Sequence, residues 1–530
     1  MTTGSTEVQE RALVAADPAA PPAGTSARPG RVELGALVLV IAGVLLRVGT
    51  TSPLWLDEAL TVNIAMLPLG EMLDALRLDG HPPLYYLLLH GWTAVFGWGD
   101  WAVRALSGLL GVAALPLLWV AGRRYGGRTC AAAAVVLYAT SPFAIRYSTE
   151  ARMYSLVALL VVGGWLALRR AEEAPTLPRL AVVTGVTAAL LLTHYWSLFL
   201  LAVVGVGLGV RLLRTRRAGG DQRPTVRLVA ALAVGALAFV PWLPAFLGQA
   251  GSTGTPWGAP ARPAPVVFIS LDDWGGGPTG EARFLGVTLL LLALLAVFGR
   301  TSGPTSVELD LRSRPRARPE AIVVLATLAL AVAASFASSA AFASRYTSVV
   351  HPLVILLAGL GVAVLPRPSV RSGVVAVLAL VGLAFGVVNL VTDRTQSGQI
   401  AAAIRAESSP DDLVVYCPDQ LGPGTSRLLS AAPEGPDGMT FPDGGDPRFV
   451  DWVDYAERVG TADVDRFVAE VLERAGSGDV WLVWSNSYRS AERPCEAVVR
   501  ALEAARPARR VVVEDGTQFE HAWLERFAAP

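Results

Sequence analysis

Long apolar runs separated by short polar segments occupy the first three quarters of the chain. A helix needs about 17–25 apolar residues to cross a bilayer. Runs of about this length lie near 33–49, 101–121, 130–147, 153–168, 179–193, 196–213, 228–247, 282–299, 320–340, 347–365 and 371–391. The pattern therefore predicts an α-helical polytopic membrane domain, with about eleven transmembrane helices over residues 31–392.

One further apolar run, at 82–96, differs from the others. It is about fifteen residues long, follows His81-Pro82-Pro83, and carries a belt of aromatic side chains. Short length, flanking prolines and interfacial aromatics are typical of a helix that lies at the membrane surface or re-enters it. We therefore expect 82–96 not to cross the membrane.

Arginine alone carries the topology signal, because the chain contains no lysine. If 82–96 does not cross and the N-terminus is cytoplasmic, the arginine-rich connections face the cytoplasm, as the positive-inside rule requires. These connections hold Arg123, Arg124, Arg128, Arg169, Arg170, Arg179, the cluster from Arg211 to Arg227, Arg300, Arg312, Arg314, Arg316, Arg318, Arg367 and Arg371. The outside segments are then 50–100, the turns at 148–152, 194–195 and 341–346, the loop 248–281, and everything after about 392.

The pattern changes at Thr392, where helix and strand signals begin to alternate. They predict helices at 399–407, 463–475 and 491–505, and strands at 413–416, 480–484 and 511–514. About 135 residues of this kind can bury a core of their own. We expect an extracytoplasmic, soluble α/β domain at 393–530. Residues 1–30 are rich in Ala, Pro, Gly, Ser and Thr and are expected to form a disordered cytoplasmic tail.

Composition supports this division. Of 530 residues, 53% are hydrophobic and only 17% charged, and the mean hydropathy is +0.47, values typical of a bundle of apolar helices rather than a soluble protein. No basic face is interleaved with aromatic residues, so nucleic acid is not an expected partner. No glycine-rich phosphate loop opens a helix of the C-terminal region, so we assign it no nucleotide.

The three cysteines show no metal-ligand spacing. Cys417 and Cys495 both fall in the outside region, where oxidising conditions permit a disulfide. Cys417 follows a predicted strand and Cys495 lies near the start of a predicted helix, so the sequence does not decide whether the two cysteines are in contact. Two free cysteines are the slightly favoured expectation.

Acidic residues gather on the outer face. Asp57 and Glu58 follow the first span in the segment SPLWLDEALTVNIA, in apolar rather than polar surroundings. Glu150 and Arg152 lie in SPFAIRYSTEARMYS, between two spans, and the topology brings them to the same face. Charges at helix ends in a bilayer are costly unless they are paired or line a wet cavity. An Arg–Glu pair that staples two helices is the alternative.

Further polar groups end other spans on this face. His194 marks one outer turn, and Arg345-Tyr346 lies in AFASRYTSVVHPL at another. Arg345 either extends to lipid headgroups or binds a lipid-linked phosphate through two-pronged, charge-assisted hydrogen bonds.

Taken together, the acidic DE after the first span, HPPLYY, SPFAIRYSTEARMYS and SRY resemble the C-type membrane glycosyltransferases. The resemblance covers residues 33–391 and is nearest to the protein O-mannosyltransferase and lipid A aminoarabinose transferase types. It implies a polyprenyl-phosphate sugar as donor, a hexosyl or pentosyl group transferred outside the cell membrane, and a glycan, lipid or protein of the cell envelope as acceptor.

The resemblance also implies roles for individual residues. Asp57 matches the aspartate taken as general base. Glu150 matches a second catalytic acid that is aspartate in many members, and its role is left open between acceptor positioning, support of the base and metal contact. Arg345 matches a donor-phosphate anchor, and metal dependence, with a divalent ion as cofactor, stays open. Residues expected to bind substrate are Glu58, His81, Tyr85, Arg152, Tyr154, His194, Arg345 and Tyr346.

Two other functions remain open. A lipid or polysaccharide transporter, or flippase, predicts polar residues deep within spans and an internal repeat, and neither is evident in this sequence. A noncatalytic relative would keep the membrane part as an anchor for the C-terminal domain.

Overall fold

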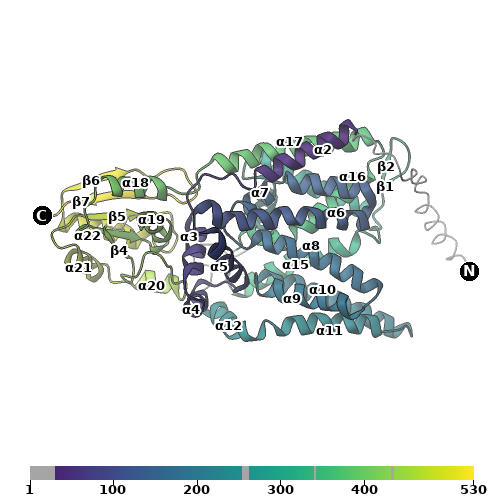
Figure 1. Ribbon diagram of the computed structural model, residues 1–530, viewed down its shortest axis with the longest axis horizontal. Helices are drawn as coiled ribbons and strands as arrows, with labels where there is room; N and C mark the ends of the chain where they lie inside the picture. The colour runs from purple at the N-terminus through teal and green to yellow at the C-terminus, as the bar shows by residue number, and fades with distance from the viewer. Residues whose placement is uncertain (1–29, 253–261, 339–341, 431–434) are drawn as a thin grey trace, which may run out of the picture.

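The computed structural model describes residues 30–252, 262–338, 342–430 and 435–530 (Figure 1). All but the last residue of the expected 1–30 tail lies outside this range. Long, roughly aligned helices form one part of the molecule, and an α/β unit stands at one end of them (Figure 1). Three short helices lie between the two parts.

Each of the eleven predicted apolar runs is helical over most of its length. The bundle helices are α2 (Arg31–Leu45), α6 (Asp100–Ala139), α7 (Pro142–Ser148), α8 (Tyr154–Glu173), α9 (Leu177–Leu191), α10 (Trp196–Arg217), α11 (Arg223–Leu237), α12 (Leu243–Ser252), α13 (Pro263–Gly275), α14 (Gly280–Phe298), α15 (Arg318–Ser338), α16 (His351–Val364) and α17 (Pro368–Val391). Two 3₁₀ turns, η1 (Val240–Trp242) and η2 (Ser344–Val349), interrupt them.

By length and composition, seven helical stretches among the described residues are long and apolar enough to cross a membrane. The protein is therefore a multi-pass membrane protein, and the figure of about eleven crossings stays a prediction. α6 holds two of the predicted runs, because the chain reverses within it. Gly127 has φ 81°, a left-handed backbone that glycine adopts without strain. Gly122 packs directly on Ala131, which a straight helix would place far away.

The arginine-rich connections lie together at the end of the bundle away from the α/β unit. Ion pairs join neighbouring helices there, including Arg124 with Glu173 and Arg211 with Glu172, the latter at 2.8 Å. The short strands β1 (Gly299–Thr301) and β2 (Val307–Leu309) mark the same end (Figure 1). The predicted cytoplasmic connections and the C-terminal unit thus occupy opposite ends of the molecule.

Three short helices, α3 (Leu56–Met66), α4 (Leu69–Asp79) and α5 (Leu84–Phe96), lie between the bundle and the α/β unit (Figure 1). α5 has 13 residues. At 1.5 Å per residue it is about 20 Å long, well short of the ~30 Å hydrocarbon core. Its length agrees with the expectation that 82–96 does not cross.

The C-terminal unit is built on a mixed sheet of order β4-β3-β5-β7-β6. β3 (Leu413–Cys417) pairs in parallel with β4 (Asp437–Thr440) and β5 (Val480–Trp484), whereas β7 (Trp523–Phe527) runs antiparallel to β5 and β6 (Arg509–Val513). The helices are α18 (Ser397–Glu407), α19 (Gly422–Leu429), α20 (Tyr455–Thr461), α21 (Val464–Ala475) and α22 (Glu492–Ala505), with the 3₁₀ turn η3 (Asp419–Leu421). All six elements predicted for this region are present.

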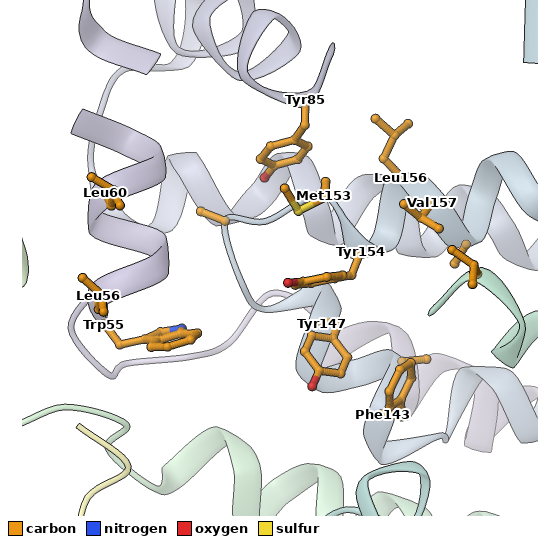
Figure 2. Packing of buried hydrophobic residues seen from close by; sticks show 14 of the residues in the cluster. Trp55, Leu56, Leu60, Tyr85, Phe143, Tyr147, Met153, Tyr154, Leu156 and Val157 are labelled. Carbon is orange, nitrogen blue, oxygen red and sulfur yellow. The ribbon is translucent and has the colours of Figure 1, made fainter. Parts of the chain in front are cut away.

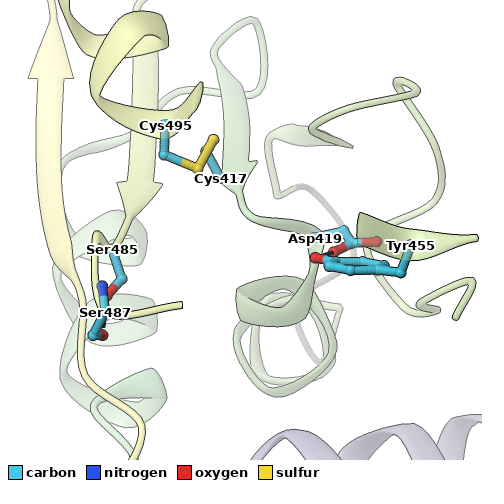
Figure 3. Close-up of a disulfide and its surroundings, with 6 residues drawn as sticks. All are labelled: Cys417, Asp419, Tyr455, Ser485, Ser487 and Cys495. Atoms are coloured by element: carbon cyan, nitrogen blue, oxygen red, sulfur yellow. Dashed lines mark hydrogen bonds between the residues drawn. A yellow bond between two sulfur atoms is a disulfide. The ribbon is translucent and has the colours of Figure 1, made fainter. Parts of the chain in front are cut away.

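Cys417, at the end of β3, and Cys495, in α22, form a disulfide (Figure 3). The expectation of two free cysteines is wrong, because β3 and α22 pack closely enough to bring the two Cα atoms to 5.5 Å. Cys130 is free and buried.

Candidate active site

Asp57 lies in the first turn of α3 and faces two arginines from distant parts of the chain. Its Oδ2 is 3.3 Å from Nη2 of Arg345 in η2 and 3.8 Å from Nη2 of Arg152, which follows α7. The Asp57 side chain is 15% exposed and that of Arg345 18%, whereas Arg152 is buried. Both side chains therefore keep some exposed surface, although Oδ2 of Asp57, the oxygen nearest Arg345, is itself buried.

Arg152 is held in place by a chain of polar contacts. Its Nη1 donates to the Thr61 hydroxyl at 2.7 Å, and its Nη2 donates to Nε2 of His81 at 2.9 Å. Because arginine can only donate, Nε2 of His81 accepts, which leaves Nδ1 to donate to the Asp79 carboxylate at 2.9 Å. Burial raises the pKa of Asp79, but the hydrogen bonds from His81 and Tyr86 and the charge of Arg152 together bring it below its ordinary value. His81 thus links Asp79 to Arg152 and, through it, to Asp57.

Glu58, next in sequence, is fully buried. Its two carboxylate oxygens accept from Nε and Nη2 of Arg104 at 2.7 and 2.5 Å, and the Ala151 N–H donates to it at 2.8 Å. Burial alone raises the pKa of Glu58, but the paired guanidinium brings it below its ordinary value. These contacts tie α3 to α6 and to the turn before α8. They leave Glu58 no exposed atom, so they do not support its assignment to substrate binding.

Glu150 is also fully buried and lies between two arginines. Its Oε1 is 3.0 Å from Nη1 of Arg394 and 3.5 Å from Nε of Arg146. Burial raises the pKa of Glu150, and the nearby Arg394 and Arg146 only partly oppose it. Glu150 therefore lies in a buried cluster of ion pairs, and one partner, Arg394, comes from the segment that leads into the α/β unit.

A further acid that the sequence analysis did not single out joins this group. Asp273, near the end of α13, accepts from the Tyr147 hydroxyl at 2.8 Å, and its Oδ1 is 3.5 Å from Nη1 of Arg146. In the sequence, the adjacent acids Asp272 and Asp273 in the outer loop 248–281 could have indicated it, but the helix α13 was not predicted there.

Aromatic rings line the space beside Asp57. Figure 2 shows the Tyr154 ring next to that of Tyr147, in an edge-to-face arrangement with 5.0 Å between ring centres, and with its hydroxyl pointing toward α3 and the Trp55 indole. The Arg345 guanidinium lies 5.8 Å from the ring centres of both Trp55 and Tyr346, a distance at which cation–π attraction operates. Tyr85 lies apart from this group, because its buried hydroxyl pairs with Ser107 at 2.8 Å. These contacts do not support a role for Tyr85 in substrate binding.

His194 packs between two of these rings. Its ring centre is 5.8 Å from that of Tyr154 and 5.4 Å from that of Tyr346. Burial and the nearby positive charges lower the pKa of His194 well below its ordinary value. Nδ1 accepts from the Trp196 N–H, so Nε2 carries the proton of the neutral ring. His194 therefore acts as an uncharged wall of the site.

An apolar cavity of about 850 Å³ lies within the bundle, and its lining does not include Asp57, Glu58 or Glu150. Side chains from α8, α9, α10, α15 and α16 line it, among them Trp165, Leu201, Gly207 and Leu353. Arg169, Arg211 and Arg214 line its end near the arginine-rich connections. Within the described residues, no group of three or more His, Cys, Asp or Glu is arranged to hold a metal ion.

Comparison with known proteins supports the resemblance stated above. A family model described as dolichyl-phosphate-mannose-protein mannosyltransferase matches residues 80–244, about a third of the chain. This stretch includes the HPPLYY motif, Glu150 and His194. A sequence search of curated proteins gives no match.

Among solved structures, the chain is similar to ArnT from Cupriavidus metallidurans. The apo form shares 15% identity with a TM-score of 0.59 and covers 94% of this chain and 98% of that chain. The form bound to undecaprenyl phosphate shares 16% identity with a TM-score of 0.58 and covers 95% and 100%. At this identity the likeness shows the fold, and it extends over the α/β unit as well as the bundle. The shared fold and the family-model match agree with the resemblance to the C-type membrane glycosyltransferases.

Proposed function

We propose that the protein is a membrane glycosyltransferase that moves a sugar from a polyprenyl-phosphate donor to an acceptor hydroxyl on the extracytoplasmic face. The observation that carries the proposal is the partly exposed ion pair of Asp57 and Arg345, 3.3 Å apart. It places a candidate general base beside a candidate phosphate-binding cation. The fold shared with an undecaprenyl-phosphate-bound relative supports a lipid-linked donor.

The proposed reaction uses these two groups in separate roles. Arg345 binds the donor phosphate, since a guanidinium fits phosphate oxygens with two parallel hydrogen bonds. The acceptor oxygen forms a bond to the sugar carbon, and its proton passes to the Asp57 carboxylate. The bond between that carbon and the phosphate oxygen breaks, and its electron pair stays on the departing phosphate. Arg345 stabilises the charge that develops there.

The remaining charged residues position this pair. Arg152, held by His81 and Asp79, orients Asp57 from the buried side. Glu150, paired with Arg394, lies behind the site, where we assign it a supporting rather than a proton-transferring role.

The apolar cavity between α8, α10 and α15 suits the polyprenyl tail. η2, which carries Arg345, packs against both α8 and α10, two helices that line the cavity. A donor whose phosphate lies at Arg345 then has an apolar path for its chain into the bundle.

Two observations support an extracytoplasmic α/β unit with the site facing outward. The arginine-rich connections lie at the opposite end of the bundle, as the positive-inside rule requires of the cytoplasmic end. The Cys417–Cys495 disulfide suits an oxidising compartment. Reporter fusions placed after Arg128 and after Pro530 should report opposite compartments, and a shared compartment would refute this topology.

The activity is tested with protein purified into nanodiscs and a panel of polyprenyl-phosphate sugars. Mass analysis of cell-envelope glycans with and without the gene identifies acceptors to add to the assay. Release of polyprenyl phosphate together with a glycosylated acceptor supports the proposal. Movement of the intact lipid between leaflets without bond cleavage would instead identify a transporter.

A further inference from the structure

A carboxylate from the C-terminal unit reaches the helix that carries Asp57. Oε2 of Glu520, in the loop between β6 and β7, accepts the backbone N–H of Leu56 at 2.7 Å. Leu56 is the first residue of α3, and the residue before it, Trp55, makes no side-chain cap. The first N–H groups of a helix have no partner within the helix. Glu520 supplies that partner from 464 positions away along the chain.

Glu520 is also connected to Glu150, the second buried acid of the site. The Glu520 N–H donates to the Arg394 carbonyl at 2.9 Å, and its carbonyl accepts from the Gln396 N–H at 3.0 Å. Arg394 in turn places its guanidinium 3.0 Å from Glu150. One residue of the α/β unit therefore connects the helix of Asp57 with the arginine that holds Glu150.

The loop that carries Glu520 is itself fixed. Oε1 of Gln396 accepts from the N–H groups of Gly516 and Ala522, at 3.1 and 2.8 Å. Phe519, 68% exposed, sets its ring edge against Trp55 with 5.5 Å between ring centres. The loop thus contacts α3 through both a hydrogen bond and an aromatic pair.

Burial makes this contact a neutral one. Glu520 is buried, no arginine in the described part of the chain pairs with it, and burial raises its pKa to about 8. The uncharged carboxyl still offers an oxygen lone pair to the Leu56 N–H. A glutamine side chain offers a similar acceptor of similar size, whereas alanine offers none.

We propose that Glu520 is a positioning residue for the transfer reaction: it caps the first turn of α3 and so fixes the direction in which Asp57 points. The C-terminal unit is then a working part of the active site rather than an appended module. This inference rests on the proposed function for its catalytic consequence, whereas the cap itself is testable without turnover.

The test compares Glu520→Ala, Glu520→Gln and Glu525→Ala in full-length protein in nanodiscs. Glu525 is the matched control, a buried acid of the same unit that accepts two hydrogen bonds from Arg509 and does not touch α3. Two quantities are measured: hydrogen exchange of peptides covering residues 54–60, and kcat and donor KM with a polyprenyl-phosphate sugar that the wild type uses.

Glu520→Ala should speed exchange at 54–60 and lower kcat at least tenfold, with donor KM within about twofold of wild type. Glu520→Gln should restore both quantities to within about twofold, and Glu525→Ala should leave exchange at 54–60 unchanged. Equal effects of Glu520→Ala and Glu525→Ala would show a general destabilisation of the α/β unit. Unchanged exchange and kcat in Glu520→Ala would show that Glu520 does not cap α3. Either result overturns the proposal. A wild type without transferase activity would refute the proposed function, while the exchange data would still decide whether Glu520 holds α3.

Discussion

Asp57 and Glu58 are neighbours in the chain, yet the structure gives them opposite environments. Asp57 reaches solvent beside Arg345, which also reaches solvent. Glu58 points about 100° away around α3, has no exposed surface, and is held by both prongs of Arg104. Two carboxylates in the same first turn are thus separated into a candidate reactive group and a structural one. Exposure and partner decide the role, not residue type.

The contrast between Asp57 and Glu58 is tested first by a substitution of Asp57. Asp57→Asn should lower turnover by about 10²–10⁴-fold, the usual contribution of general-base catalysis. The thermal midpoint should change much less than in Glu58→Gln, because the Asp57–Arg345 pair is partly exposed. The check is kcat in the transferase assay together with a melting curve in the same detergent. Near-normal turnover would remove Asp57 from the reaction.

Glu58→Gln should act on stability instead. Removing one partner of a buried ion pair leaves an uncompensated charge on Arg104, at a cost of about 3–5 kcal/mol. We expect a lower melting temperature, with donor KM unchanged in the protein that remains folded. Glu71→Gln, at an exposed position of α4, is the control and should melt like wild type. A stable Glu58→Gln variant without turnover would exchange the roles of the two acids.

Arg345→Ala tests the role of the cation that faces Asp57. A hydrogen bond to a charged group contributes about 1.5–3 kcal/mol, so donor KM should rise about 10–100-fold while the protein stays folded. Arg345→Lys should recover only part of this, because a point charge cannot form the two-pronged contact. Arg77→Ala, which removes an exposed pair on α4, should leave donor KM unaltered, and equal values for the two alanine variants would return Arg345 to a headgroup contact.

Much of the fold could be predicted from the periodicity of apolar residues along the chain. The eleven apolar runs are helical over most of their length, and the three helices and three strands predicted for the C-terminal region lie within a few residues of their predicted bounds. β4 was missed because Asp437–Thr440 is short and lacks alternation, and α13 because the whole helix is only 13 residues long. The short elements β7, α19 and α20 were not predicted either. Local pattern locates long or regular elements and misses brief ones.

The candidate site could be predicted only in part from the sequence, for a different reason. Asp57, Glu150, Arg152 and Arg345 were found because each stands out as a charge at the outer end of an apolar run. Arg104, Arg394 and Glu520 were missed because nothing near them in sequence marks them. Their partners lie 46, 244 and 464 positions away, and only tertiary packing brings them together.

A smaller effect is expected in the apolar cavity that we assign to the donor tail. Gly207 lines this cavity, and no atom lies within 4 Å of the place a Cβ would take. Gly207→Phe should therefore fold and occupy space needed by the tail. Displacing a single CH₂ group costs about 0.8 kcal/mol, or about a fourfold rise in donor KM. Gly205→Phe on the same helix is the control, since Gly205 has equal room but does not line the cavity; a similar rise in both would exclude the tail assignment.

The smallest effect concerns the contrast between two buried carboxyls, Glu58 with an arginine partner and Glu520 without one. Burial raises the pKa of Glu520 from 4.5 to about 8, and the charges of Asp57 and Glu58 act in the same direction, whereas hydrogen bonds from Leu56 and Thr395 oppose it. Between about pH 4.5 and 8 the folded protein then keeps a proton that the unfolded chain has lost. Stability contributed by this group falls as pH rises through that window.

Glu520→Gln removes this titration while keeping the acceptor for Leu56. Its melting temperature relative to wild type should therefore climb steadily between pH 5 and pH 8. Melting curves of both proteins in one detergent at four pH values measure the difference. Tyr488, whose phenol also faces Glu520, stays neutral throughout, because burial raises its pKa well above the ordinary value. Parallel curves would mean that Glu520 titrates in the folded protein at the same pH as in the unfolded chain, which would contradict the raised pKa.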